Sequence, residues 1–469
     1  MVGVGAMIGA GIFVLTGLAA EIAGPAALLV FALNGGVTLF TAMSYAELAA
    51  AIPKNGGGYA YVRETFSAPV AFVMGWTRWF TYMAAGALYA LGFASNVVEF
   101  VHLYWTGLPA GPTWQVVYAL LAVGSFVALN ALSTEASGGA ETVITLVKIA
   151  ILGVFVVFGV GAVSTTTFLG VDPGTPVGLS AFVSEGAQKV LPAMGLTFIA
   201  FQGYDLIATV TEEVEDPRKN IPRAIFVSLG VTVLVYLLVV GVALGTLGPS
   251  RLGAAGEKAV VEAAVGFMPD VALFGASIGA ALIAFGAVFS TVSALNAVVI
   301  GSSRIAFAMG REGQLPGRLG RIHHRYGTPY QALIASGGLM LVATVTAPIS
   351  LVGNLASLFS LLGFSVVNLA VIKLRRDQPD LSRPFEMPLY PAMPVVGIAL
   401  NLLLAAFISP LTWAIALGWL LFGGAVYLGL GRLRGSEEFG ADPEPKPEAE
   451  TGAEPEPTSG EPPEPVPED

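Results

Sequence analysis

The sequence predicts an all-α integral membrane protein with twelve transmembrane helices. Of its 469 residues, 55% are hydrophobic and only 12% are charged, and the mean hydropathy is +0.76. Soluble globular chains carry about 25% charged residues. The second observation is a series of apolar stretches of about 20 residues, the length that crosses a bilayer. The third is that the first and sixth stretches are interrupted midway, which predicts a five-plus-five inverted repeat with two extra C-terminal helices.

The predicted spans lie at about 1–23, 25–51, 69–98, 113–132, 140–162, 187–211, 223–247, 271–308, 331–348, 351–373, 393–409 and 411–431. The first five would form one repeat, about 1–162, and the next five a second repeat, about 187–373. The helices within about 393–431 would be peripheral. An odd number of spans per repeat gives the two repeats opposite topologies. The third and eighth stretches exceed one membrane thickness, so we expect them to tilt or project.

Lysine and arginine predict the orientation. With Met1 on the cytoplasmic side, the basic residues near 54–63, 218–223, 311–325, 373–383 and 432–434 all fall inside. Only Lys189, Arg251 and Lys258 fall on or near the outer side. Because cytoplasmic loops carry the excess of basic residues, we expect a multi-pass protein of the cell membrane with both termini in the cytoplasm.

The net charge of −10 comes from the C-terminal end. Residues 435–469 contain twelve acidic residues and one lysine, whereas residues 1–434 contain 21 basic and 20 acidic residues. A segment so rich in Pro and Glu cannot bury apolar surface, so we predict a transmembrane domain over 1–434 and a disordered acidic cytoplasmic tail over 435–469. At the other end only eight residues precede Gly9, about 12 Å of helix, so we expect the protein to start upstream of Met1.

The first interruption lies at Val4–Phe13, where glycines at positions 5, 9 and 11 are too dense for an unbroken helix. Irregular backbone at membrane depth is tolerated where it lines a cavity. A helix broken there offers free N–H groups on one half and free carbonyls on the other, which suits a zwitterion or a coupling ion. The alternative is a Gly-rich packing face between helices.

The second interruption lies five spans later, in the run Phe198-Ile199-Ala200-Phe201-Gln202-Gly203-Tyr204-Asp205. Two interrupted segments in corresponding positions of two halves indicate the binding site of a transporter. Asp205 could cap the lower half-helix by accepting backbone N–H bonds, or it could face the substrate; we favour the cap.

Lys148 is about nine residues into the fifth span, roughly 13 Å deep. Ionisable residues at membrane depth are functional candidates, and an ammonium held away from water can exchange a proton near neutral pH. The alternative is a lysine that snorkels to the interface. Ser293 in the eighth span could meet Lys148 or an ion, although such hydroxyls usually bond their own helix. Arg78, between Trp76 and Trp79, is interpreted as an interfacial anchor.

Enzymatic chemistry has little support in the sequence. Cysteine is absent and only three histidines are present, which argues against a zinc site and against thiolate chemistry. No nucleophile–base pair is apparent. We therefore predict no catalytic residues, no metal, no cofactor and no nucleic acid partner.

Four motifs lie along the chain. The first is Gly9-Ala10-Gly11-Ile12-Phe13, and the second is Pro53-Lys54-Asn55-Gly56-Gly57-Gly58-Tyr59. The others are the run from Asp205 to Pro222 and the run from Ser303 to Pro316. Together these motifs resemble the amino acid–polyamine–organocation (APC) superfamily, especially prokaryotic cationic amino acid transporter-like members, over about residues 1–431. The resemblance implies a leucine-transporter-like fold and transport of a small amino acid substrate.

The resemblance also implies roles for individual residues. The substrate α-carboxylate would meet backbone N–H groups of Gly9, Ala10 and Gly11. Its α-amino group would meet carbonyls of Met7 or Ile8 in the first span, and of Phe198, Ile199 or Ala200 in the sixth. Lys148 matches the fifth-span lysine of proton-coupled members. That lysine would contact a first-span carbonyl near Gly5 or Ile8, and the region of Ser293.

Two positions depart from the pattern of cationic-type relatives. Thr81 stands where those relatives tend to carry a Glu, and Gln202, next to Gly203, stands where the family is usually apolar. The first departure argues against cationic substrates, and either could mark a preference for a neutral or polar side chain.

The sequence therefore predicts a secondary active amino acid transporter that works by alternating access, with proton symport through Lys148. An exchanger without net proton coupling is one alternative. A second is a substrate sensor in which the acidic tail signals occupancy. A channel is disfavoured because the breaks predict an occluded site at the midplane.

Overall fold

The structure is a computed structural model that describes residues 2–53, 56–132, 138–170, 187–209, 214–269, 272–273 and 276–433. The predicted tail, 435–469, lies outside these residues, as do Lys54 and Asn55. The helices are α1 Val2–Met7, α2 Ala10–Ala23, α3 Ala27–Ala51, α4 Gly57–Thr65, α5 Ala68–His102, α6 Pro112–Leu132, α7 Gly138–Gly159, α8 Thr165–Leu169, α10 Ala187–Thr197, α11 Tyr204–Ile207, α12 Pro217–Leu247, α13 Pro249–Ala255, α14 Ala259–Val265, α15 Ile278–Arg311, α16 Tyr330–Thr346, α17 Ile349–Asp377, α18 Ala392–Ala406 and α19 Pro410–Leu433.

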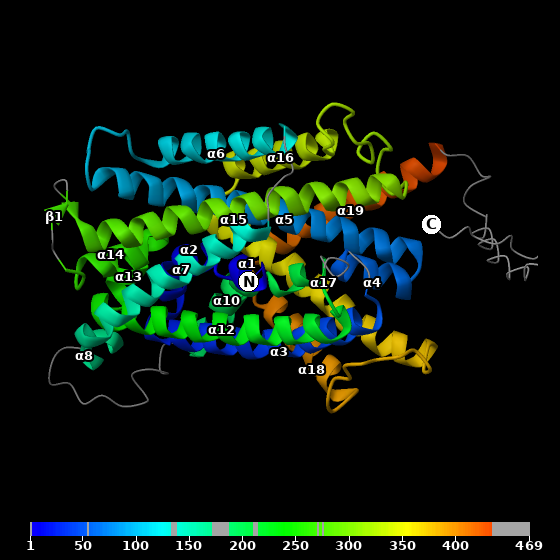
Figure 1. Cartoon of the computed structure of the whole chain (residues 1–469), viewed down its shortest axis with the longest axis horizontal. Helices are drawn as coiled ribbons and strands as arrows, with labels where there is room; N and C mark the ends of the chain where they lie inside the picture. Colours follow the sequence, from blue (N-terminus) through cyan, green and yellow to red (C-terminus); the bar gives the residue numbers. More distant parts are fainter. Residues whose placement is uncertain are drawn as a thin grey trace, which may run out of the picture.

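Short 3₁₀ segments join or extend several helices: η1 Gly24–Ala26, η2 Val160–Ala162, η3 Phe198–Phe201 and η5 Gly256–Lys258. The described strands are β1 Ala272–Leu273 and β2 Ala276–Ser277, which pair antiparallel with Ala272 opposite Ser277. The long helices lie roughly side by side along the long axis of the molecule (Figure 1). The described part is therefore an all-helical bundle apart from one two-residue ladder.

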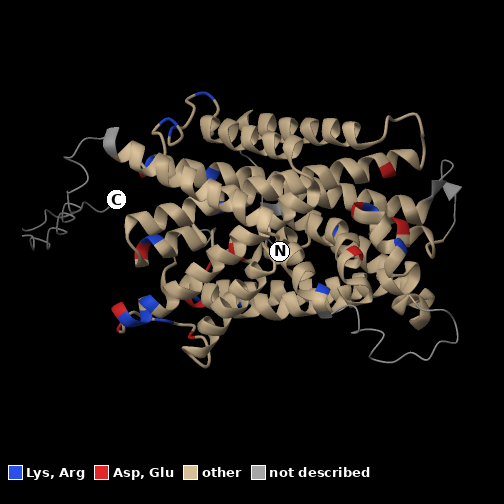
Figure 2. Cartoon of the chain, turned by 180° about the vertical axis from the view of Figure 1, so that it is seen from behind, with Lys and Arg blue, Asp and Glu red and all other residues tan. Residues whose placement is uncertain are grey.

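Nine segments of the described chain are helical, long and apolar enough to cross a membrane. One of them, Gly3–Ala51, has 49 residues and contains both α2 and α3, with the turn η1 between them. Two shorter apolar helices, α16 and α18, are added to these nine. Charged residues gather towards the two ends of the bundle, and few lie in its middle (Figure 2). This distribution fits a bundle whose middle faces hydrocarbon.

Two helices, α12 and α15, start six or seven residues away from the predicted spans. The predicted seventh span begins near 223, but α12 begins six residues earlier, at Pro217. Proline is well suited to the first turn of a helix, which explains the earlier start. The predicted eighth span covers 271–308, whereas α15 runs from Ile278 to Arg311. Hydropathy alone missed both starts, since α12 opens with charged residues and apolar residues precede α15.

The core of the bundle is built around α5, a helix of 35 residues. It packs against α15, α17, α6 and α16. Trp76 of α5 stacks on Trp419 of α19, with ring centroids 4.5 Å apart, and donates its indole N–H to the Trp419 carbonyl. The C-terminal helix therefore covers the tryptophan face of α5.

A buried carboxylate ties α3 to the segment between α17 and α18. Glu47 of α3 accepts two hydrogen bonds from Arg375, at 2.7 and 2.8 Å, and one from the Met387 N–H at 2.8 Å. Its side chain is 3% exposed. Because a buried charge needs partners for its lone pairs, this carboxylate holds the segment between α17 and α18 against α3.

We expect Glu47→Ala to destabilise the protein by about 2–3 kcal/mol, because it leaves the Met387 N–H and the partly buried Arg375 guanidinium, 18% exposed, without this acceptor. Thermal unfolding of the purified protein measures the effect. The matched control is Glu99→Ala, which breaks the ion pair with Lys258. The side chains of Glu99 and Lys258 are 34% and 38% exposed. Such a surface pair contributes about 1 kcal/mol or less, so equal losses in the two variants would contradict the account.

Candidate functional site

The first predicted interruption is a break between α1 and α2. Met7 ends α1 and Ala10 begins α2. The Ile8 N–H donates to the Val4 carbonyl and the Gly9 N–H to the Met7 carbonyl, both at 2.7 Å. The Gly9 donor is thus engaged within the break itself. The following N–H groups, which open α2, have no partner within that helix.

The second predicted interruption is a break between α10 and α11, in the sixth predicted span. After α10 the chain continues as the 3₁₀ turn η3, Gln202 is extended, and Gly203 has φ +141° before α11 begins. The Ile199 N–H donates to Ser357 Oγ of α17 at 3.1 Å, and that hydroxyl donates to the Leu196 carbonyl at 3.0 Å. A scaffold helix therefore holds the irregular turn.

The two breaks touch each other. A Cβ on Gly11 would lie 2.8 Å from Ala200 Cα, and a Cβ on Gly203 would lie 2.8 Å from the Met7 nitrogen. Real Cβ atoms essentially never come so close to backbone atoms, so both positions need glycine. The structure thus brings together the two segments that the sequence analysis singled out.

Tyr236 of α12 joins the two breaks, and the sequence analysis missed it. Its hydroxyl lies 2.5 Å from the Met7 carbonyl oxygen and 2.9 Å from the Ala200 carbonyl oxygen. Its ring packs edge-on against Phe31 and Phe201. A tyrosine in the middle of an apolar helix needs a partner for its hydroxyl, and this was the signal in the sequence.

Ser290 of α15 meets the first break. Its hydroxyl lies 2.9 Å from the Gly9 carbonyl oxygen and 3.2 Å from that of Ile8. The sequence analysis selected Ser293, one turn further along, and did not select Ser290.

Lys148 of α7 is 1% exposed. Its ammonium lies 3.3 Å from the Gly5 carbonyl oxygen of α1 and 3.1 Å from Ser293 Oγ of α15. These are the contacts that the resemblance implied. A snorkelling lysine would reach the exterior, so its burial argues against that alternative. Its role in proton coupling stays a prediction.

A buried ion pair lies directly beside the second break. Arg78 of α5 pairs with Asp205 of α11, and their side chains are 4% and 2% exposed. The other Asp205 oxygen accepts the Gly203 N–H at 3.0 Å. Arg78 also donates to the Tyr82 hydroxyl at 3.1 Å, and it lies 2.9 Å from the Gln202 amide oxygen when that amide is turned towards it.

The interpretation of Arg78 as an interfacial anchor is wrong. Trp76 and Trp79 are 3% and 4% exposed and pack under α19, so the tryptophans do not form a belt at the membrane surface. The preference for a backbone-capping Asp205 is correct in part. The carboxylate accepts a backbone N–H, but from Gly203 ahead of α11, and it also carries the ion pair with Arg78.

Two interrupted helices that meet inside an apolar bundle, with helix ends facing one another, define the binding site of a membrane transporter. The comparisons with known proteins agree with this class. The amino acid permease family model matches residues 1–432. The chain therefore belongs to the amino acid permease family of the APC superfamily, and it is a multi-pass membrane protein.

Three relatives of the chain differ in the compounds that their names mention. The chain is 30% identical to the branched-chain amino acid permease BcaP of Bacillus subtilis, over 91% of this chain and 90% of the relative. It is 30% identical to the methylthioribose transporter of the same species, over 91% and 90%. It is also 30% identical to the large neutral amino acids transporter small subunit 2 of Rattus norvegicus, over 90% and 78%. The family and these relatives are transporters, which confirms that the chain is not an enzyme.

Proposed function

We propose that this protein is a secondary active transporter that binds one amino acid where the two helix breaks meet. The observation that carries the proposal is the contact of Gly11 with Ala200 and of Gly203 with Met7. Two helix ends of opposite polarity at one point suit the two charges of a zwitterion.

In this proposal the substrate carboxylate binds the N–H groups of Ala10 and Gly11, with Gly9 in a lesser role because its N–H already bonds Met7. The amino group binds carbonyls of the two breaks, on Met7, Ile8, Phe198, Ile199 and Ala200. Each carbonyl has two lone pairs, so those that face Tyr236 or Ser290 keep one for the substrate.

We propose twelve membrane crossings in two inverted repeats of five, about 1–162 and 187–373, with α18 and α19 peripheral. The 49-residue segment Gly3–Ala51 is about 74 Å long as helix, enough for two crossings. The shorter helices α16 and α18 supply two more. Basic residues on one side favour a cell-membrane protein with both termini in the cytoplasm.

We propose that transport is coupled to a proton that Lys148 exchanges. The support is the buried ammonium between α1 and α15, at Gly5 and Ser293. Gain or loss of this proton would strengthen or weaken the hold of the two helices on each other, which couples protonation to the first break.

For the substrate we favour a neutral amino acid. Thr81 supplies no carboxylate for a cationic side chain, and its hydroxyl bonds its own helix at the Thr77 carbonyl, 2.9 Å away. Two of the three relatives bear the names of branched-chain and large neutral amino acids. The buried Arg78 charge is already paired with Asp205, so the pair leaves no net charge to select a charged side chain.

Uptake into sodium-free proteoliposomes tests these assignments. The panel is labelled leucine, phenylalanine, serine, arginine and methylthioribose, with and without an inward proton gradient. We expect gradient-driven accumulation of a neutral amino acid. Uptake only into vesicles preloaded with amino acid would instead make the protein an exchanger. Accumulation of methylthioribose alone would contradict the substrate class, and retained substrate binding without any flux would favour the sensor.

We expect Tyr236→Phe to lower amino acid uptake about tenfold while the protein still folds. The change removes the one hydroxyl that joins both breaks and leaves two buried carbonyls without it, at a cost of about 1–3 kcal/mol. The matched control is Tyr118→Phe, which removes a tyrosine hydroxyl bonded to the Pro109 carbonyl away from the site. Uptake equal to wild type in Tyr236→Phe would contradict the role of the tyrosine.

A further inference from the structure

A groove of about 570 Å³, lined by no residue of the helix breaks, lies between the start of α12 and the segment that precedes α18. The basic residues Arg218, Lys219 and Arg223 line it together with the apolar residues Phe226, Pro384 and Phe385. The rings of Phe226 and Phe385 pack with centroids 5.5 Å apart. The groove therefore combines cations with an apolar wall.

The basic side chains of this groove stay without anionic partners among the described residues. Other basic residues towards the same end are paired, such as Arg63 with Glu312 and Lys373 with Asp377. Arg218, Lys219 and Arg223 are exposed and form no ion pair within the described chain. Among the described residues that line the groove, Asp216 carries the only carboxylate, so these residues carry a net charge of about +2 at neutral pH.

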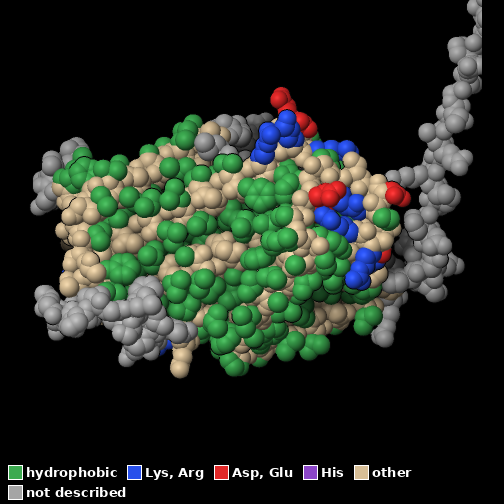
Figure 3. Space-filling view, turned by 90° about the horizontal axis from the view of Figure 1, so that it is seen from below, with side chains coloured by type: hydrophobic (Ala, Val, Ile, Leu, Met, Phe, Trp, Pro, Cys, Tyr) green, Lys and Arg blue, Asp and Glu red, His purple; other side chains and the backbone are tan. Residues whose placement is uncertain are grey.

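An apolar stripe runs from the groove along α12. Val227, Leu234 and Leu238 are 63%, 59% and 44% exposed. With Arg223 and Gly230 they recur every three or four residues, so they share one face of the helix. A Cβ on Gly230 would meet nothing within 4 Å, which leaves a gap in the stripe at this position. On the face seen from below, hydrophobic surface continues up to basic side chains at one end (Figure 3).

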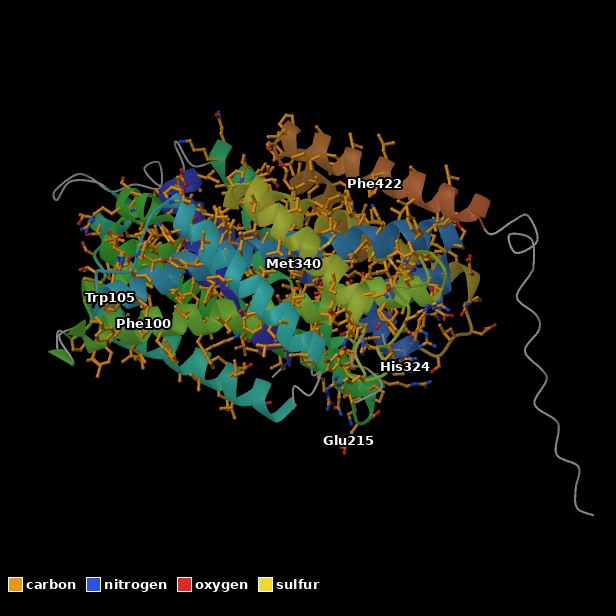
Figure 4. The ribbon with its side chains drawn as sticks, turned by 90° about the horizontal axis from the view of Figure 1, so that it is seen from above. Phe100, Trp105, Glu215, His324, Met340 and Phe422 are labelled. Atoms are coloured by element: carbon orange, nitrogen blue, oxygen red, sulfur yellow. The ribbon has the colours of Figure 1, made fainter. Side chains whose placement is uncertain are left out.

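The groove lies towards the end of the molecule that carries the other basic loops. Glu215, just ahead of α12, and His324 of the loop before α16 lie towards one end, whereas Phe100 and Trp105 lie at the other (Figure 4). By the excess of basic residues, the end with Glu215 is the cytoplasmic one. The inner leaflet of a cell membrane carries anionic lipid headgroups.

We propose that this groove binds an anionic phospholipid, with the phosphate on Arg218, Lys219 and Arg223 and an acyl chain along the stripe of α12. The charge and the adjoining apolar stripe fit both parts of one lipid. A free phosphate would use only the basic part. The acidic segment 435–469 would complement the charge, but Phe439 and Val466 are its only large apolar residues, too few to cover the stripe. The proposal depends on the membrane location and not on which substrate is transported.

Native mass spectrometry of the full chain tests the site, with dioleoyl phosphatidylglycerol titrated against dioleoyl phosphatidylcholine. We expect wild type to prefer phosphatidylglycerol about tenfold or more, since each basic residue near a lipid surface contributes about fivefold. The triple variant Arg218→Gln, Lys219→Gln, Arg223→Gln should lose that preference. The matched control Arg318→Gln, Arg321→Gln, Arg325→Gln removes the same charge from an exposed loop and should keep it.

Two further measurements separate lipid from a free anion. Gly230→Leu fills the gap in the stripe and should weaken phosphatidylglycerol binding several-fold with all three basic residues intact. Inorganic phosphate should not displace the lipid; displacement at millimolar phosphate would make this a simple anion site and overturn the proposal. Equal losses in the two triple variants would overturn it too. The proposal would also be overturned if the full chain showed no preference for phosphatidylglycerol over phosphatidylcholine, including the case in which its own acidic tail fills the groove.

Discussion

Lys148→Ala is expected to abolish proton-driven accumulation of substrate while substrate binding persists. For symport of one proton, a gradient of one pH unit can drive about tenfold accumulation, because one unit corresponds to about 1.4 kcal/mol. The variant lacks the ammonium that lies between the Gly5 carbonyl and Ser293 and that would take up and release the proton. Uptake into proteoliposomes with an inward proton gradient should therefore fall to the level measured without one.

Two further variants separate the proton from the charge. Lys148→Arg keeps a cation in place, but a guanidinium does not release its proton in a protein, so it should lose gradient-driven uptake as Lys148→Ala does. Lys189→Ala removes a lysine that is exposed at the start of α10 and should behave as wild type. Gradient-driven uptake that is unchanged in Lys148→Ala would contradict proton coupling through this residue.

Breaking the ion pair between Arg78 and Asp205 is expected to have the largest effect on stability. Arg78→Met leaves the Asp205 carboxylate buried without its partner, and Asp205→Asn does the same to the guanidinium. Each change should cost about 3–5 kcal/mol, because an uncompensated buried charge is strongly destabilising. Since Asp205 also holds the Gly203 N–H in the second break, both variants should lose most of their transport.

The double variant Arg78→Met, Asp205→Asn tests whether the effect comes from the charges. Replacing both members of a buried pair is often nearly neutral, so the double variant should be more stable than either single variant. The coupling should exceed about 2 kcal/mol in a double-mutant cycle of thermal unfolding. The control is Arg63→Met, which breaks the ion pair with Glu312. The Arg63 side chain is 53% exposed, so this change should cost about 1 kcal/mol or less. Additive losses in the double variant would contradict a direct ion pair.

The sequence analysis could locate the two breaks because they depend on local chemistry. Closely spaced glycines weaken a helix inside an apolar span, and the first span breaks at Ile8 and Gly9, between α1 and α2. In the other span the helix is interrupted at Gln202 and Gly203. The depth of Lys148 follows from counting residues at 1.5 Å each. These features needed no knowledge of which helices pack together.

The partners of these residues could not be predicted, because they depend on tertiary packing. Arg78 and Asp205 are 127 positions apart in the chain, and no local pattern pairs them. The tryptophans around Arg78 have the spacing of an interfacial belt, but α19 covers them. Likewise, the hydroxyls of Tyr236 and Ser290 reach the breaks only because α12 packs against α1 and α15 packs against α2.

The most direct test of a shared site at the breaks is a structure of the protein determined with its transported amino acid bound. We predict the substrate carboxylate within hydrogen-bond distance of the N–H groups of Ala10 and Gly11, and the amino group on carbonyls of the two breaks, such as Phe198 and Ile199. That result would establish that α2 and the second break bind one ligand together. A substrate bound away from both breaks would contradict the account.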